Sequence, residues 1–329
     1  MPRMSADGVF SYGDGIFAVD SVYDRRLQTA IHLLIERGRV AVVDTGTSHA
    51  VPRVLAALEA QGLGPGAVDY VILTHVHLDH AGGAGALMAR FPNAKLTVHP
   101  RGARHMIDPS RLLAATVAIY GEEETRRVYG EIVPVPKERV IETGEGARLS
   151  LAGRELEFMD VPGHARHHVA IRDRRTGGIF AGDTFGISYR ELDIGNRQFG
   201  IPTTSPSQFE PAALHQSIDR MLAAGADAGA PAMYLTHFGR LTDPVRIAAD
   251  LHRLIDAHAA LGERVRHSGE RRNSLLREGV TSILLGEKEV QGWRLSEGEL
   301  LQLFALDIEL NAQGLAAWLD SSERKTSAG

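Results

Sequence analysis

Residues 74–80 read Thr74-His75-Val76-His77-Leu78-Asp79-His80, and this short stretch decides how the rest of the chain is interpreted. Three imidazoles and one carboxylate stand within these seven residues. Neutral imidazole and carboxylate are the ligand types that hold Zn²⁺, Fe and Mn in proteins. A string of the form HxHxDH rarely arises by chance, so we interpret it as a metal-binding sequence rather than as a run of solvated loop histidines.

The flanking residues place this cluster between a strand and a helix. Residues 69–74 form a short apolar run with several β-branched side chains, which is typical of a buried strand. Residues 81–91 are rich in small side chains and indicate a helix start. Sites in α/β proteins form at the carboxyl ends of strands. His75 and His77 can point to one side of an extended chain, whereas Asp79 and His80 lie beyond the bend, so the spacing suggests two metal ions.

Composition limits the class of protein. The chain has 329 residues, of which 43% are hydrophobic, and this suits one large domain or a domain with an extension. The net charge of −5 argues against a nucleic-acid surface, and we expect a small-molecule substrate instead. There is no cysteine, so His, Asp or Glu must hold any metal. We expect a cytoplasmic protein without membrane contact, because Met1–Asp20 lacks an apolar leader core and no stretch is long enough to span a bilayer.

The pattern of apolar and turn residues divides the chain near residue 240. Before it, strands alternate with helices; after it, we predict a helical extension packed on the first part. The expected units are a main domain over 1–240 and the extension over 241–329, with a frayed tail at Ser321–Gly329. Within the extension, apolar spacing predicts two helices, Pro244–Val265 and Ser296–Leu319. The extension could cap the site or form the face of a homodimer.

Three later strand ends each carry one further ligand-type residue. Val161-Pro162-Gly163-His164, Ala181-Gly182-Asp183-Thr184 and Leu235-Thr236-His237-Phe238 all follow apolar runs, and Asp44-Thr45-Gly46 ends an earlier one. The order HxHxDH, PGH, GDT and THFG, preceded by DTG, resembles the metallo-β-lactamase superfamily of metallo-hydrolases. The resemblance covers about residues 9–240 and is more specific for the fold than for a substrate.

The resemblance implies an α/β fold, a four-layer αββα sandwich with metals at one edge and here a C-terminal helical extension. Every metal position of the family pattern is filled by the expected residue type. Carried over, the first metal would take His75, His77 and His164, the second Asp79, His80 and His237, and Asp183 would bridge them. Asp44 would orient a ligating imidazole, and His168 matches a structural histidine that many members have.

Such a site predicts hydrolysis by metal-bound hydroxide. Two divalent ions can lower the pKa of a shared water and polarise the bond under attack. Zn²⁺ is the first expectation, with Fe or Mn as alternatives, because the donor set is all His and Asp. We expect a carboxylic ester, a thioester or a lactone as substrate, with a phosphoester also open, and Asp79 as the catalytic residue that orients the nucleophile and moves its proton.

The segment Phe185–Phe209 follows Asp183 and is long for a connection, so we expect it to line the substrate pocket. Tyr189 is a candidate donor to an oxyanion, and Arg190 a candidate partner for an anionic group. The alternative for Arg190 is a surface ion pair with Glu191 or Asp193.

Other functions stay open at this stage. Persulfide dioxygenase-like members keep the HxHxDH string but use one iron. Flavodi-iron-like members usually have Glu where His77 stands, so His77 argues against them. A metal-containing signalling or binding protein with residual esterase activity is a further alternative, whereas the acidic balance opposes a nuclease.

Overall fold

The computed structural model describes residues 8–204, 208–226 and 232–327. Within these ranges one mixed sheet of seven strands runs in the order β1 to β7. Its first strands form antiparallel hairpins, and β4 to β7 are parallel. The strands are β1 (Val9–Gly13), β2 (Ile16–Asp20), β3 (Ala30–Glu36), β4 (Arg39–Val43), β5 (Val68–Ile72), β6 (Lys95–Val98) and β7 (Val140–Glu142).

A second sheet of six strands has the order β13-β12-β11-β10-β9-β8. Its pairs are antiparallel except for β11 and β12, which are parallel. β9 and β11 both run antiparallel to β10, so β9, β11 and β12 end at the same edge. The strands are β8 (Arg148–Leu151), β9 (Arg154–Asp160), β10 (Val169–Asp173), β11 (Ile179–Gly182), β12 (Met233–Leu235) and β13 (Gly239–Leu241).

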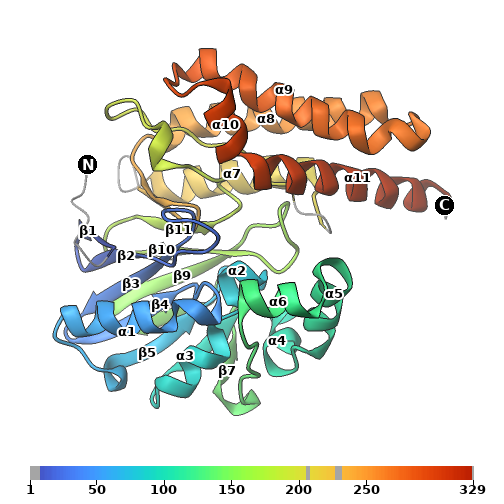
Figure 1. Cartoon of the computed structure of the whole chain (residues 1–329). Coiled ribbons are helices and arrows are strands. Elements are labelled where there is room, and N and C mark those ends of the chain that lie inside the picture. The colour runs from blue at the N-terminus through green and yellow to red at the C-terminus, as the bar shows by residue number, and fades with distance from the viewer. Residues whose placement is uncertain (1–7, 205–207, 227–231, 328–329) are drawn as a thin grey trace.

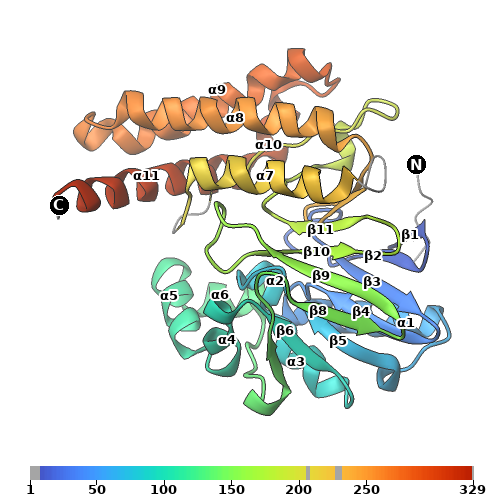
Figure 2. The same ribbon diagram turned by 180° about the vertical axis from the view of Figure 1, so that it is seen from behind.

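The two sheets pack face to face, and helices cover both outer faces (Figures 1 and 2). Strand periodicity explains the three layers of core. In β3, Leu34 faces the second sheet while Leu33 faces the helices on the outer side, because neighbouring side chains alternate. The helices beside the first sheet and its edge are α1 (Val51–Ala60), α2 (Leu78–Ala81), α3 (Ala84–Arg90), α4 (Pro100–Ile107), α5 (Ser110–Tyr120) and α6 (Glu122–Tyr129).

The outer face of the second sheet is covered by α7 (Pro211–Gly225) and by the C-terminal helices. These are α8 (Pro244–Val265), α9 (Arg272–Gln291), α10 (Glu297–Leu303) and α11 (Ala305–Ser327). One continuous core joins them to the sheet, with Leu235 of β12, Leu251 of α8 and Leu315 of α11 all fully buried. No helix in the described part of the chain is both long and apolar enough to cross a membrane.

The predicted αββα fold with C-terminal helices is confirmed, but the extension differs in detail from its prediction. Helix α9 was not predicted, and the predicted helix Ser296–Leu319 is broken at Phe304 into α10 and α11. Phe304 is buried against Tyr189 and Trp293, which holds the break in place. Where a frayed tail was expected from Ser321, α11 continues to Ser327, and residues 328–329 lie outside the described residues.

A buried ion pair fastens the second sheet to the β1–β2 turn. The Arg154 guanidinium donates to both oxygens of Asp173, at 3.0 and 2.6 Å, and to the Asp14 carbonyl at 2.6 Å. Both side chains of the pair are fully buried. Replacing Arg154 would therefore leave an uncompensated charge in the interior.

We expect Arg154→Ala to lower the free energy of unfolding by about 3–5 kcal/mol, because it breaks a buried pair from one side. Urea denaturation followed by circular dichroism measures the change. Arg148→Ala on neighbouring β8 is the matched control, since that side chain is 65% exposed and should contribute at most about 1 kcal/mol. Equal effects of the two substitutions would contradict this role for Arg154.

Candidate metal centre

The predicted ligands stand just beyond strand ends that meet at one edge of the two sheets. His75 follows β5, His164 follows β9, Asp183 follows β11 and His237 follows β12. The backbone N–H of Val169 donates to the Thr74 carbonyl at 2.8 Å, which ties the two sheets together at this edge. Asp79 and His80 lie on the short helix α2. The fold thus brings together in space all seven residues that the sequence predicts as ligands.

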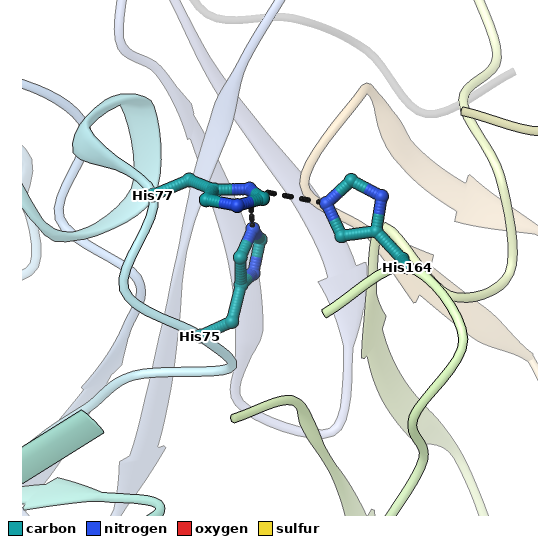
Figure 3. Close-up of side chains that lie close together, drawn as sticks. All are labelled: His75, His77 and His164. Atoms are coloured by element: carbon teal, nitrogen blue, oxygen red, sulfur yellow. Dashed lines mark hydrogen bonds between the residues drawn. The ribbon is translucent and has the colours of Figure 1, made fainter. Parts of the chain in front are cut away.

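Three imidazoles form the first group (Figure 3). His77 Nδ1 lies 2.8 Å from His75 Nε2 and 3.1 Å from His164 Nε2. The possible ligand atoms of these three residues all lie within 4.8 Å of one another. Three nitrogens converging on one point are a suitable set for a transition-metal ion.

Two further groups overlap with the first. His75, His80 and Asp183 form one, and Asp79, His80 and His237 form the other, again with ligand atoms within 4.8 Å. Asp79 Oδ2 lies 3.2 Å from His237 Nε2 and 3.4 Å from His80 Nε2. The mixed nitrogen and oxygen donors suit Zn²⁺, Fe or Mn.

Asp183 links the groups through its two oxygens. Oδ1 lies 3.3 Å from His80 Nε2, while Oδ2 lies 3.6 Å from His164 Nε2. Both His80 Nε2 and Asp183 Oδ1 are buried and form no well-aligned hydrogen bond with any residue in the described ranges. A buried polar atom without a partner is costly, and a cation between them would satisfy both. The residues therefore fit a pair of metal ions with Asp183 between them.

Hydrogen bonds at the other ring nitrogen fix how the imidazoles are turned. His237 Nδ1 donates to the Gln28 carbonyl at 3.0 Å, and His164 Nδ1 to the Thr203 carbonyl at 3.3 Å. His80 Nδ1 donates to Asp44 Oδ2 at 3.0 Å. In each ring Nε2 then faces the ligand cluster. Such bonds hold the tautomer and orientation that metal binding needs.

The Asp44 carboxylate accepts hydrogen bonds from three other parts of the site. Besides His80, it accepts the Thr74 backbone N–H at 2.8 Å, the Thr74 hydroxyl and, at 2.7 Å, the Thr236 hydroxyl. The side chain is fully buried. Asp44 thus lies beside the His80 imidazole and outside the three ligand groups, and its role in orienting a metal ligand stays a prediction.

His168 holds the backbone of Asp183 through a hydrogen bond. Its Nε2 accepts the backbone N–H of Asp183 at 3.1 Å, and the ring is buried. A Cβ at Gly182 would come within 2.5 Å of this nitrogen, and Gly182 has φ of 51°, so the turn requires glycine there. His168 thus holds the turn that carries Asp183.

Burial and neighbouring charges set the protonation of the three imidazoles of the first group and of the Asp79 carboxyl. Burial, followed by the neighbouring rings, holds the pKa of His75 and His77 well below the usual value, and burial also lowers the pKa of His164. These rings are neutral at pH 7, which is the form that binds metals. At Asp79, burial opposes ionisation, but the imidazoles of His80 and His237 outweigh it and hold the carboxyl pKa well below normal. Asp79 is therefore ionised at neutral pH.

Comparison with known proteins identifies the family. The sequence model of the Metallo-beta-lactamase superfamily matches residues 24–228, which is more than half of the chain. The chain belongs to this superfamily. Its fold agrees with solved members: a metallo-β-lactamase family protein from Thermus thermophilus has a TM-score of 0.63 at 23% identity, covering 96% of this chain and 95% of that one. An archaeal member from Sulfolobus tokodaii has a TM-score of 0.60 at 19% identity, with 92% and 99% covered.

Curated relatives within the superfamily are hydroxyacylglutathione hydrolases. The one from Stenotrophomonas maltophilia is 34% identical over 152 residues, which are 46% of this chain and 44% of the relative. The one from Cronobacter sakazakii is 24% identical over 290 residues, 88% of this chain and 91% of the relative. The chain thus spans less than half the length of the relative it matches at 34% identity.

The segment Phe185–Phe209, which the sequence leads us to expect at the substrate pocket, passes beside the candidate ligand His237. The backbone of Ser188 exchanges hydrogen bonds with His237 and Phe238. Tyr189 is buried, and its hydroxyl donates to both oxygens of Asp307 at 2.9 Å. A contact of Tyr189 with an oxyanion therefore stays a prediction, and the partner seen here is a carboxylate of α11. Residues 205–207 of the loop lie outside the described residues.

Arg190 has one of the two partners that the alternative named, but the ion pair is largely buried rather than at the surface. It pairs with Asp193 at 3.3 Å. It also lines a cavity of about 420 Å³ together with Phe238 and Arg240. A role for Arg190 in holding an anionic substrate stays a prediction.

Sequence reasoning missed the residues through which the C-terminal helices reach the metal centre. Burial raises the pKa of Asp307 on α11 to about 6, against the opposing influence of Tyr189 and His237. Asn311, one turn further on, accepts the Thr204 backbone N–H at 2.7 Å through Oδ1 and the Thr204 hydroxyl at 2.8 Å through its carbonyl. Neither residue lies in a motif. Only their polarity at inward positions of an apolar helix could have marked them.

We expect Asp44→Asn to weaken metal binding by about 10–100-fold, because the amide cannot accept four hydrogen bonds and hold the His80 ring as a carboxylate does. Competition with a chromogenic chelator measures the affinity. Asp69→Asn, at the other end of β5 and paired with Arg39, removes the same charge far from the ligands and should change nothing. Unchanged affinity in Asp44→Asn would refute this role.

We expect Asn311→Ala to loosen the first ligand group, because the Thr204 backbone loses a buried partner next to the Thr203 carbonyl that orients His164. An unmet buried N–H costs about 1–3 kcal/mol, so metal affinity should fall by about ten-fold or more if the strain reaches His164. The exposed Gln313→Ala on the same helix is the control. If both variants bind metal equally well, α11 does not support the ligand.

Proposed function

We propose that this chain is a dinuclear metal-dependent hydrolase of thioesters. The observation that carries the proposal is the position of Asp183, whose two oxygens face His80 and His237 on one side and His164 on the other. This arrangement supports two adjacent cations rather than one. When bound, two such cations would lower the pKa of a shared water and polarise the carbonyl under attack.

The side chains of the centre divide the remaining work. Asp79 is ionised and half-buried, whereas the other carboxylate of the cluster, Asp183, is buried. Asp79 can therefore take the proton of the attacking water at its carboxylate and return it to the departing thiolate. His77 is likewise only half-buried, so the substrate would approach from the side of His77 and Asp79.

The relatives favour a thioester over the other ester classes. The hydroxyacylglutathione hydrolases are named for a thioester substrate, and one of them aligns with most of this chain. Oxygen esters, lactones and phosphoesters are the alternatives within the same chemistry. A cytoplasmic location, a small-molecule substrate and a dimer through α8–α11 stay predictions.

The test is a substrate panel on protein of known metal content. We expect about two transition-metal ions per chain, and hydrolysis of acyl thioesters with a higher kcat/KM than the matched oxygen esters, lactones or phosphodiesters. Asp79→Ala should lower kcat by about 10²–10⁴-fold, the range of a general acid–base group. Asp256→Ala, an exposed carboxylate on α8, is the control. A stoichiometry of one ion, or a preference for another substrate class, would overturn the proposal.

A further inference from the structure

A second polar region adjoins the metal centre on the side of His77. A cavity of about 510 Å³ lies between α4, α5 and the turn that carries His164. His77 lines this cavity, so an occupant of the cavity would lie next to the first ligand group. The polar lining consists of His77, Arg101, Arg104, His105, Arg166 and His167, together with Gln208. None of the functions described above uses these arginines.

The lining is positively charged although the chain as a whole carries a net charge of −5. Three arginines contribute to it, and no Asp or Glu is found among its described residues. Arg166 is paired with Glu210, with contacts of 3.0 and 2.5 Å. Arg101 and Arg104 have no carboxylate partner within the described ranges; Arg101 Nη1 donates to the Arg166 carbonyl at 3.2 Å, and Arg104 Nε to His105 Nε2 at 3.3 Å. Most of their N–H groups are thus free for a ligand.

The histidines of the cavity carry no positive charge at neutral pH. Burial, followed by the charges of Arg104 and Arg111, lowers the pKa of His105. Burial, followed by the neighbouring imidazoles, lowers the pKa of His167 to about 4. These rings are therefore neutral hydrogen-bonding groups, and the guanidinium groups supply the positive field.

Packing fixes the two unpaired arginines relative to the metal ligands. His99 begins α4 by accepting the backbone N–H of Arg101 on Nδ1 at 3.0 Å. Gly102 lies so close to the histidine loop that a Cβ would come within 2.8 Å of Val76 Cγ1. Arg101 and Arg104 are three residues apart and share one face of α4. The position of the helix is therefore fixed, and both arginines line the cavity together with Val76 and His77.

We propose that this cavity binds an anionic group of the substrate, a carboxylate or a phosphate located several bonds from the thioester carbonyl. Guanidinium groups bind both anions in a bidentate manner, and two unpaired ones on one helix face make a specific site for either. The inference rests on the proposed thioester hydrolysis for its reacting group. It adds that the hydrolase selects anionic thioesters over neutral ones, and that α4 makes this selection.

The first experiment compares matched pairs of acetyl thioesters on metal-loaded protein. One pair is N-acetylcysteine and its amide, and the other is 4′-phosphopantetheine and pantetheine. The double variant Arg101→Gln/Arg104→Gln should lose about ten-fold or more in kcat/KM for the anionic member, the size of one charge-assisted hydrogen bond, and keep its rate on the neutral member within about two-fold. The double variant Arg90→Gln/Arg264→Gln removes two exposed arginines outside the cavity and should behave as wild type.

Loss with the carboxylate pair, the phosphate pair or both supports the proposal and identifies the anion. Equal kcat/KM in wild type and the Arg101/Arg104 variant for both pairs overturns it while thioester hydrolysis stands.

The second experiment measures binding without turnover. Calorimetry follows the S-methyl thioethers of N-acetylcysteine and 4′-phosphopantetheine binding to wild type and to both double variants. We expect at least one thioether to bind wild type about ten-fold more tightly than the Arg101/Arg104 variant. If this difference is found but no thioester is hydrolysed, the anion site stands and the proposed reaction falls. If neither thioether distinguishes the proteins, the anion site is refuted whatever the activity.

Discussion

The metal centre depends on one buried carboxylate, that of Asp44. It gathers the start of the histidine loop, the end of β12 and the ring of His80 by accepting hydrogen bonds from each. A carboxylate in the interior is tolerated only when it is fully hydrogen-bonded. Moving any of the three segments away would break one of these bonds and lower the stability of the fold. Asp44 has φ of 56°, a backbone region that Asp tolerates better than most residues. The same carboxylate therefore holds the two sheets together and orients the His80 ring.

Four of the seven candidate ligands could be located from sequence because His75, His164, Asp183 and His237 closely follow apolar strands. A strand end is visible as a change from apolar residues to Gly, Pro or Thr, and His164, Asp183 and His237 all follow such a change. Their convergence was not visible in spacing alone, because it depends on which strands run parallel. β9, β11 and β12 end on the same side of the second sheet, whereas β10 between them runs the other way. The family resemblance supplied that topology.

The C-terminal helices were harder to predict, and the reasons are local. Helix α9 contains Gly279 and Gly286, which lower helix propensity and hide the four-residue spacing of its buried side chains. Gly279 is needed there, since a Cβ would come within 2.2 Å of the Leu261 side chain. The break at Phe304 likewise arises from burial in a tertiary cluster. Helix α9 and the break at Phe304 both depend on contacts between segments distant in sequence. The periodicity of apolar residues gives no information about such contacts.

The proposed selectivity would lie outside the metal ligands for the same reason. The ligands are confined to strand ends, where buried hydrogen bonds leave them little freedom to vary. α4 and α11 pack on that edge from opposite parts of the chain: Gly102 brings α4 against Val76, and Asn311 holds α11 on Thr204. Each helix thus brings polar groups close to the centre without taking part in its coordination. Under the proposed anion site, changes of charge on α4 would alter which substrate is held, while the ligand geometry, anchored at Asp44, would stay the same.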